Sequence, residues 1–346
     1  MSVAITSRPP RRTALLVGIN YRGTENELNG CYNDVVNVSQ YLRTALGYAP
    51  GAISVLTDGN RDSPAFPASV APTRQNILAG MAALVAGMVA GDEAVFHFSG
   101  HGTLVRDRNG DELTGLDSCL CPLDYAGGGV ITDDEIRALL VNKVPRGARL
   151  YVVLDCCHNG TGCDVRYKYE DFSILLRPPS ARTAALWRTQ QKAFANPKYT
   201  ETAGEVYMIS GSRDEQTSAD AYINNAFAGA LTYAVFAILR ANQATIRTYS
   251  WSSLLRDVRH FMRSNRYSQI PQLMTGQLIS PARPVFAIAA AGSRGVETGG
   301  LQLSSGSNSG FRSVAEPSET TLYLLSSKPK SGMSSHRHRT PLQFFM

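Results

Sequence analysis

The sequence predicts an α/β fold in which a mostly parallel central sheet of about six strands is covered by helices on both faces. Short, continuous apolar runs recur along the chain, as expected of strands that are buried on both sides. Segments with helical spacing of apolar residues separate these runs, which favours a parallel sheet with helical crossovers. A chain of 346 residues is also long enough to bury such a core without disulfides.

The first part of the expected core follows from the spacing of apolar residues. Residues 13–19 form a continuous apolar run that predicts the first strand. In residues 33–46, Val35, Val38, Leu42 and Leu46 recur at helical spacing, and Gly47 ends the predicted helix. A second strand is expected at residues 53–56 and a small, apolar helix at residues 73–89.

The rest of the chain repeats this alternation. Apolar runs predict further strands at residues 94–98, 149–154 and 205–209, with a shorter sixth strand at 272–274. Helices are expected at residues 133–141, 226–240 and 252–263. In parallel sheets, functional side chains gather beyond the carboxyl ends of the strands, so those ends are the places to search for a site.

Composition divides the chain into three parts: a short disordered segment at 1–12, one folded domain at 13–291, and a disordered tail at 292–346. The tail contains 12 Ser and 7 Gly with little periodicity. The net charge is +6, and half of it lies in this tail, so no basic stripe is expected on the fold and no nucleic-acid partner is predicted.

Two compositional features bear on the compartment. Six cysteines in 346 residues are too few for a disulfide scaffold, which favours a reducing, cytoplasmic location. The chain has no run of about eighteen apolar residues and no apolar core in its first twelve residues, so neither a membrane span nor a signal peptide is expected.

Two of the expected strand ends carry residues suited to nucleophilic catalysis. The third strand leads into His101, which glycines flank on both sides, and the fourth leads into the pair Cys156 and Cys157. A thiolate with an imidazole within hydrogen-bond reach is the arrangement of a Cys–His hydrolase. The sequence alone does not say which cysteine faces the cleft, and His158 is too close in sequence to act as the base.

Six blocks of the chain resemble, in order, the pattern of the type I metacaspases in the caspase-like clan of cysteine peptidases. They lie at residues 15–21, 28–34, 97–102, 117–124, 155–160 and 210–220. His101 and Cys157 lie 56 positions apart, near the roughly 50 positions given for caspases. The resemblance implies a caspase-like α/β/α sandwich, a monomer, and a peptidase that cuts after Arg or Lys. Asn159 and Thr161 depart from the serines of many relatives.

The resemblance also assigns roles to individual residues. It implies Cys157 as the nucleophile, His101 as base and general acid, and the amides of Gly102 and Cys157 as the oxyanion hole. It places the pocket for the substrate's cationic side chain at four residues: Cys31, Asp34, Ser99 and Asp155. A buried cation needs carboxylates, which supports this assignment independently. The alternatives are a loop-capping role for Asp155 and a helix N-terminal role for Asp34.

Calcium is the cofactor that the resemblance implies, with ligands at Asp117, Asp133, Asp134 and Asp164. Hard cations take several oxygen ligands, so a set of carboxylates is suitable. The alternative for Asp133 and Asp134 is helix capping, because Thr132 and Glu135 form a capping-box pattern around them. The chain has no EF-hand loop, so the site would be assembled from distant segments.

Three further hypotheses complete the sequence-based expectations. Residues 166–199 are rich in Lys and Arg and form either a solvated linker or a self-cleavage segment with open sites at Arg182, Arg188 and Lys192. A catalytically silent caspase-like scaffold is one alternative to the peptidase. A zinc module is the other, with ligands drawn from Cys119, Cys121, Cys156, Cys157, His158 and Cys163, although their spacing is not that of a known zinc motif.

Overall fold

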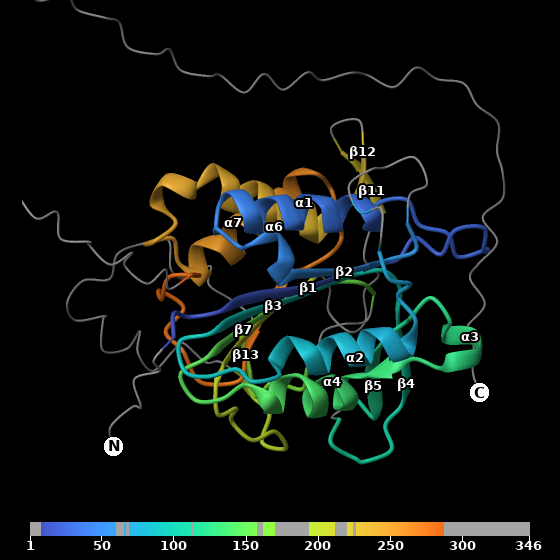
Figure 1. The fold of residues 1–346 in the computed structure, drawn as a ribbon, viewed down its shortest axis with the longest axis horizontal. Helices are drawn as coiled ribbons and strands as arrows, with labels where there is room; N and C mark the ends of the chain where they lie inside the picture. The colour runs from blue at the N-terminus through green and yellow to red at the C-terminus, as the bar shows by residue number, and fades with distance from the viewer. Residues whose placement is uncertain are drawn as a thin grey trace, which may run out of the picture. The chain divides into compact units, whose positions relative to one another are not determined.

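The computed structural model describes residues 8–59, 66, 69–112, 114–157, 162–169, 194–211, 220–223 and 226–286. Its centre is an eight-stranded sheet of order β2-β1-β3-β7-β10-β13-β8-β9 (Figure 1). The strands are β1 (Arg12–Gly18), β2 (Ile53–Thr57), β3 (Glu93–Ser99), β7 (Arg149–Asp155), β8 (Tyr167–Tyr169), β9 (Phe194–Ala195), β10 (Glu205–Ser210) and β13 (Gln272–Thr275). The first five in sheet order run parallel, and the remaining pairings are antiparallel.

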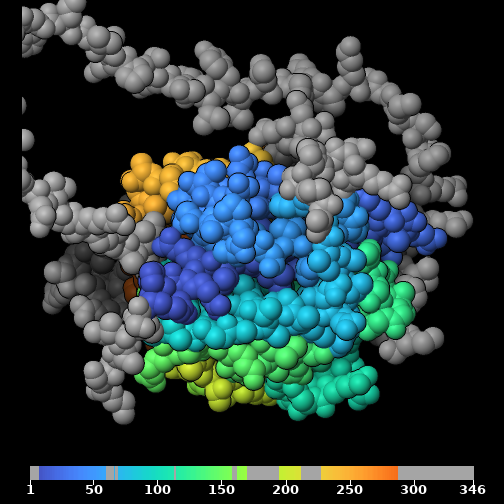
Figure 2. All heavy atoms as spheres, viewed as in Figure 1, coloured from blue at the N-terminus to red at the C-terminus, as the bar shows by residue number. Residues whose placement is uncertain are grey.

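Helices cover both faces of this sheet. One layer consists of α1 (Cys31–Thr44), α6 (Ala230–Ala241) and α7 (Trp251–Ser264), and the other of α2 (Arg74–Val85) and α4 (Asp133–Leu139) (Figure 1). In the space-filling view, the region of α1 in blue lies above the region of α2 in cyan (Figure 2). Short elements complete the chain: α3 (Tyr125–Gly128), η1 (Pro50–Ala52), η2 (Val141–Lys143) and η4 (Gln243–Thr245).

The continuous apolar runs are explained by two separate hydrophobic cores. Along β7, Tyr151 and Val153 belong to the core under α1, α6 and α7, whereas Leu150, Val152 and Leu154 belong to the core under α2 and α4. Side chains of a strand alternate between faces, so a strand covered on both sides must be apolar at every position. The predicted α/β/α sandwich with its mostly parallel sheet is confirmed.

Two of the expectations need correction. The sheet has eight strands instead of about six, because β8 and β9 extend it, and both lie within the segment expected to be a solvated linker. They are two or three residues long and were too short to give a periodic signal. The helix expected from residue 226 begins at Ala230, because residues 226–229 form β12 and pair with β11 (Asp220–Ile223).

A second small sheet forms beside the main one from β4 (Gly102–Arg106), β5 (Leu116–Leu120) and β6 (Ile131–Thr132). At the amino end, residues 8–12 lie along the start of β3. Arg8 forms an ion pair with buried Asp92, and Asp92 also accepts the amide of Arg11 at 2.7 Å. The tail at 292–346 lies outside the described residues. Within the part of the chain that is described, no helix has the length and apolarity needed to cross a membrane.

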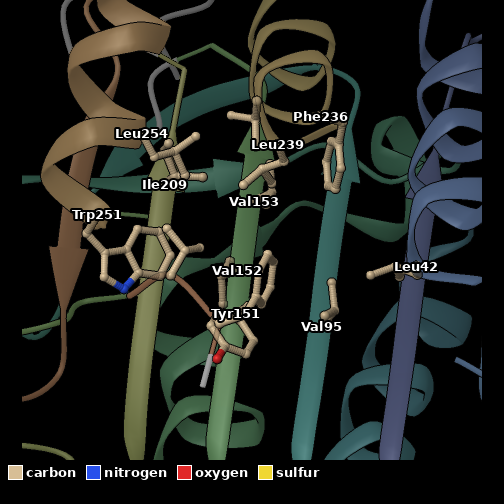
Figure 3. Close-up of a pocket in the computed structure, with 13 residues that line it drawn as sticks. Leu42, Val95, Tyr151, Val152, Val153, Ile209, Phe236, Leu239, Trp251 and Leu254 are labelled. Atoms are coloured by element: carbon tan, nitrogen blue, oxygen red, sulfur yellow. The ribbon is translucent and has the colours of Figure 1, made fainter. Parts of the chain in front are cut away.

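A small apolar cavity of about 30 Å³ lies between the sheet and the layer of α6 and α7. Val153, Ile209, Leu239, Trp251 and Leu254 are among the residues that line it (Figure 3). Void space of this size forfeits packing contacts, so it is a local weakness of the core.

Filling this cavity is expected to stabilise the protein. Val153→Ile adds one methylene to a lining strand residue, which is expected to raise the free energy of unfolding by about 1 kcal/mol and the Tm by about 2–3 °C. Differential scanning calorimetry measures both. Val17→Ile, at a completely buried position in the core of the opposite face, is the control and should lower the Tm. A fall in Tm for Val153→Ile would contradict the expected gain.

Candidate active site

The register of the parallel strands brings three predicted segments together at one edge of the sheet. Gly18 at the end of β1 pairs with Ser99 at the end of β3, and Ser99 pairs with Asp155 at the end of β7. The segments that carry His101 and Cys157 therefore leave the sheet side by side. Parallel strands end at a common edge, which is why residues more than fifty positions apart meet here.

His101 is held by the segment between β1 and α1, which precedes it in the chain. The hydroxyl of buried Tyr21 accepts the amide N–H of His101 at 2.9 Å and donates to the carbonyl of Cys121 at 2.5 Å. The Tyr21 and His101 rings lie 4.7 Å apart between centroids. The imidazole Nε2 lies 2.7 Å from the carbonyl oxygen of Asn26. A carbonyl only accepts, so we assign the proton to Nε2, which leaves Nδ1 as the nitrogen that takes up a further proton.

The two cysteines at the end of β7 differ in exposure. Cys156 is completely buried in the core under α2 and α4, whereas Cys157 is partly exposed. The backbone of Cys157 lies directly against Gly102, where a β-carbon would be 2.0 Å from the Cys157 carbonyl oxygen. Only glycine permits this approach, so Gly102 joins the segment of His101 to the segment of Cys157.

Asp34 is a buried carboxylate at the start of α1 that accepts hydrogen bonds from two distant elements. The Ser99 hydroxyl donates to its Oδ2 at 2.6 Å, and the amide of Gly229 lies 3.0 Å from each carboxylate oxygen. A role confined to the N-terminus of its own helix does not account for these contacts. Cys31 lies buried one turn earlier on α1, with its amide donating to the side chain of Asn20 at 3.0 Å.

Asp155 is the second buried carboxylate of this region. Its Oδ2 accepts the amide of Thr232, in the first turn of α6, at 2.8 Å. A β-carbon on Gly229 would lie 2.2 Å from Oδ2 of Asp155 and 2.7 Å from Oδ2 of Asp34. The two carboxylates therefore converge on the same glycine. All four predicted pocket residues lie at this edge of the sheet, and Asp34, Ser99 and Asp155 converge around the start of α6.

Sequence reasoning missed several residues that build this region: Tyr21, Asn26, Gly229 and Thr232. Tyr21 lay within a recognised block, but nothing marked its hydroxyl as a support for His101. Asn26 acts through its backbone carbonyl, which no residue type signals. Gly229 precedes an apolar helical run, and a glycine at a helix start was the available signal for a close approach.

The four predicted metal ligands form one acidic cluster with three residues that sequence reasoning missed. Ligand oxygens within each of three overlapping groups lie within 4.8 Å of one another: Asp107, Asp111 and Asp117; Asp111, Asp134 and Asp164; and Glu112, Asp133 and Asp164. The missed residues belong to the loop between β4 and β5, where the pattern Asp-x-Asn-Gly-Asp-Glu at residues 107–112 was the available signal.

The helix-capping alternative is present in the structure, since Asp133 and Asp134 lie in the first turn of α4, but their side chains also make contacts outside this helix. Thr132 and Glu135 form the capping box of α4 themselves. Asp133 instead accepts the amide of Ser118 at 2.8 Å, and Asn109 donates to Asp134. The capping box is therefore real, but it leaves Asp133 and Asp134 for other contacts.

The cluster has the properties of a cation site. Among the described residues, Oδ1 of buried Asp117 and Oδ1 of buried Asp164 have no hydrogen-bond partner. Burial first, and then repulsion from Asp134 and other acids, raises the pKa of Asp117 to about 6. Burial and the neighbouring carboxylates likewise raise the pKa of Asp133 and Asp164 well above the usual range. Crowded, buried carboxylates with unused oxygens are the donors that a hard cation such as Ca²⁺ takes.

The cysteines do not form a comparable site. In the ranges that the structure covers, the clusters able to hold a metal consist entirely of carboxylates. Burial raises the pKa of Cys121 to about 12, and it raises the pKa of Cys119 and Cys163 above the usual range as well. Zinc binds thiolates, so these thiols are poor ligands. His158 and Asn159 lie outside the described residues.

Comparison with known proteins agrees with the family resemblance found in the sequence. Residues 12–166 match a family model described as the metacaspase, peptidase C14 domain. A metacaspase-1 from Yarrowia lipolytica is 36% identical over 291 residues, which cover 76% of this chain and 61% of the relative. A metacaspase-1 from Pyricularia oryzae is 37% identical over 291 residues, which cover 76% of this chain and 71% of the relative.

Among solved structures, a Geobacter sulfurreducens protein is similar over 79% of this chain and 96% of its own, with a TM-score of 0.52 and 25% identity. The structure of a caspase-1 from Spodoptera frugiperda aligns over 79% of this chain with a TM-score of 0.44 and 11% identity.

Proposed function

Because the chain belongs to the metacaspase family, whose members are cysteine-type peptidases acting on peptide bonds, we propose that it is a calcium-dependent endopeptidase that cleaves after Arg or Lys. The observation that carries this proposal is the convergence of two buried carboxylates, Asp34 and Asp155, beside the strand ends that lead to His101 and Cys157. This arrangement supports the proposal, because a pocket for a cationic side chain would then lie next to the proposed nucleophile and base.

The proposed chemistry begins at Cys157. His101, with Nε2 held by the carbonyl of Asn26, takes the thiol proton at Nδ1, and the thiolate attacks the substrate carbonyl carbon. The imidazolium then protonates the leaving amine, and water hydrolyses the acyl-enzyme with His101 acting as base. The interaction of Nε2 with Asn26 supports this order, because it holds the ring in place and leaves Nδ1 as the nitrogen that exchanges the proton.

The developing oxyanion is assigned to the amides of Gly102 and Cys157. The contact between the Gly102 backbone and the Cys157 carbonyl group supports this assignment, because it brings the two peptide segments to the same place. Donors fixed in advance by a packed backbone stabilise the tetrahedral intermediate without reorganisation.

The substrate's Arg or Lys side chain is assigned to the pocket of Asp34 and Asp155, with Ser99 and Cys31 at its sides. Asp34 already accepts from Ser99 and Gly229, and Asp155 from Thr232. These donors hold both carboxylates in fixed orientations in the absence of substrate. A guanidinium or ammonium group then meets an ordered pair of negative charges.

A peptide assay separates this function from the alternatives. The peptidase should cleave a fluorogenic peptide with Arg at the cleavage site when millimolar calcium is present, and lose this activity in chelator. If the purified protein is well folded and metal-free and shows no turnover at any added calcium concentration, the result would support a catalytically silent scaffold. Zinc in the purified protein, with unfolding by chelator and no turnover, would support a zinc module.

Calcium would be held by Asp117, Asp133, Asp134 and Asp164, where it neutralises the crowded carboxylates and orders the loop between β4 and β5. Asp107, Asp111 and Glu112 of that loop are close enough to the cluster to take part.

The stability of the metal-free protein is expected to depend on pH because of this cluster. The folded-state pKa of Asp117 is raised to about 6, and the pKa values of Asp133 and Asp164 are raised as well. Because the folded protein holds these protons more tightly than the unfolded chain, protonated carboxyls add to the free energy of unfolding. This contribution is fully present below the unfolded pKa of about 4, and it is lost as the pH rises through the raised folded-state pKa values. The Tm of metal-free protein should therefore fall between pH 5 and pH 8.

Adding calcium should reverse this loss, with a gain of about 3 °C at ten times Kd and a larger gain at pH 8 than at pH 5. Asp164→Asn should abolish the gain. Glu25→Gln, at an exposed position, is the control and should retain it. A calcium response in Asp164→Asn equal to that of the original protein would contradict the assigned ligands.

Self-cleavage is expected between β8 and β9, in residues 170–193, which lie outside the described residues. Mass spectrometry after calcium addition should find new termini after Arg182, Arg188 or Lys192, and Cys157→Ala should remain intact. An uncut chain between residues 166 and 199 would contradict this expectation. The proposed monomer and the reducing, cytoplasmic location stay predictions, with size-exclusion chromatography as the test of the first.

A further inference from the structure

We propose that His97 is a positioning residue of the cation pocket, acting through Thr232 on Asp155. This inference rests on the proposed function, since it concerns how the pocket for the substrate's cationic side chain is held in shape. It assigns a role to a buried histidine that the chemistry at Cys157 and His101 does not use.

His97 lies in the middle of the sheet, far from solvent. It is completely buried on β3, with Leu16 beside it on β1 and Val153 on β7. Its Nε2 lies 3.1 Å from the hydroxyl of Thr232, which is also completely buried. Its Nδ1 has no hydrogen-bond partner among the described residues. A buried polar ring with one unpaired nitrogen lowers the stability of the fold relative to an apolar side chain at the same position. A histidine here therefore suggests a functional role.

Thr232, which His97 contacts, also contacts a carboxylate of the proposed cation pocket. The amide of Thr232 donates to Oδ2 of Asp155 at 2.8 Å, and three residues earlier the amide of Gly229 donates to Asp34. The first turn of α6 therefore holds both carboxylates with its backbone. Within the described residues, the hydroxyl of Thr232 forms its side-chain hydrogen bond with His97, so His97 helps to fix where that turn begins.

The chemistry of His97 suits a fixed support. The imidazole and the Thr232 hydroxyl share one buried hydrogen bond, in which the hydroxyl can accept from Nε2–H or donate to Nε2. Burial lowers the pKa of His97 to about 3, so the ring stays neutral throughout the physiological range. A neutral ring supports Thr232 without placing a positive charge beside Asp155, where it would compete with the substrate's cation.

A close approach at Gly229 explains why small displacements matter here. The two carboxylates lie so near this glycine that a β-carbon would collide with both. If the first turn of α6 shifts, the spacing between Asp34 and Asp155 changes with it. The expected consequence is weaker binding of a cationic side chain with little change in the chemical step.

The test compares binding of two peptides that differ only in charge, one with Arg and one with citrulline at the cleavage position. Kd values are measured by calorimetry on the full chain carrying Cys157→Ala, so that no turnover is needed. His97→Leu is expected to raise the Kd for the Arg peptide about ten-fold and to leave the citrulline peptide within about two-fold. His97→Gln keeps a donor near the position of Nε2 and should restore most of the affinity.

Two further sets of variants separate positioning from general destabilisation. Thr232→Val removes the hydroxyl but keeps the amide, and should reproduce the loss, whereas Thr232→Ser should not. Val95→Ala, on the same face of β3, weakens the core without touching Thr232 and should lower the Tm with an unchanged Arg-to-citrulline ratio. If His97→Leu fails to fold, the pair of Thr232 variants carries the test.

The outcomes for the inference and for the proposed function are distinct. An unchanged ratio in both His97→Leu and Thr232→Val, while Asp155→Asn loses the preference for Arg, would overturn the role of His97 and leave the pocket assignment standing. No preference for Arg over citrulline in the parent protein would instead contradict the proposed function.

Discussion

Replacing Cys157 with alanine is expected to lower kcat/KM for an Arg peptide by at least about four orders of magnitude, because the nucleophile is removed and no other exposed thiol occupies its place among the described residues. The measurement is the rate of fluorogenic peptide hydrolysis at saturating calcium. The Tm should stay nearly unchanged, since Cys157 is partly exposed and lies outside the hydrophobic cores.

Cys156→Ala is the matched control, one residue away. Its thiol is completely buried in the core under α2 and α4, so the variant should lose about 1–2 kcal/mol of stability and keep most of its activity at low temperature. The opposite pattern, with activity lost in Cys156→Ala and kept in Cys157→Ala, would assign the nucleophile to Cys156.

The second large effect is expected from Asp155→Asn. An asparagine can still accept the amide of Thr232 through its side-chain oxygen, so the pocket keeps its shape while one negative charge is lost. Removing one carboxylate from a buried, charge-assisted contact costs about 3–4 kcal/mol, which corresponds to a loss of 10²–10³ in kcat/KM for Arg peptides. The loss should be much smaller for a citrulline peptide.

Asp257→Asn provides the control for this change. Asp257 is a partly exposed acid on α7 that accepts from Tyr249 and Arg256, remote in sequence from the pocket residues. Its substitution should leave the preference for Arg intact. Equal losses for the Arg and citrulline peptides in Asp155→Asn would show that Asp155 supports the fold and does not read the substrate's charge.

The positions of the main strands along the chain could be predicted because each signal is local. A strand buried on both faces must be apolar along its whole length, so β1, β3, β7 and β10 each appear as a continuous run. The short strands β8 and β9 escaped prediction, because two or three residues carry no periodicity. Their place in the sheet depends on the distant strand β13, which pairs with β8, and β8 in turn pairs with β9.

The residues of the acidic cluster could be predicted only in part. Asp117, Asp133, Asp134 and Asp164 were identified through the family resemblance, while reasoning from the residues alone favoured helix capping for two of them. The tertiary structure adds Asp107, Asp111 and Glu112, because the loop between β4 and β5 folds back onto α4 and Asp164. Only that folding brings these oxygens within reach of one another.

By itself, the sequence determined the α/β architecture and the strand ends that carry His101 and Cys157. Through the family pattern, it also marked the residues that we propose for the cation pocket. The tertiary structure alone decided that Cys157 is exposed while Cys156 is buried, that the carbonyl of Asn26 holds His101, and that Gly229 and Thr232 hold the two carboxylates. The physical reason is that exposure, backbone hydrogen bonds and close approaches depend on the distances between segments far apart in the chain, whereas apolar runs and short motifs are properties of neighbouring residues.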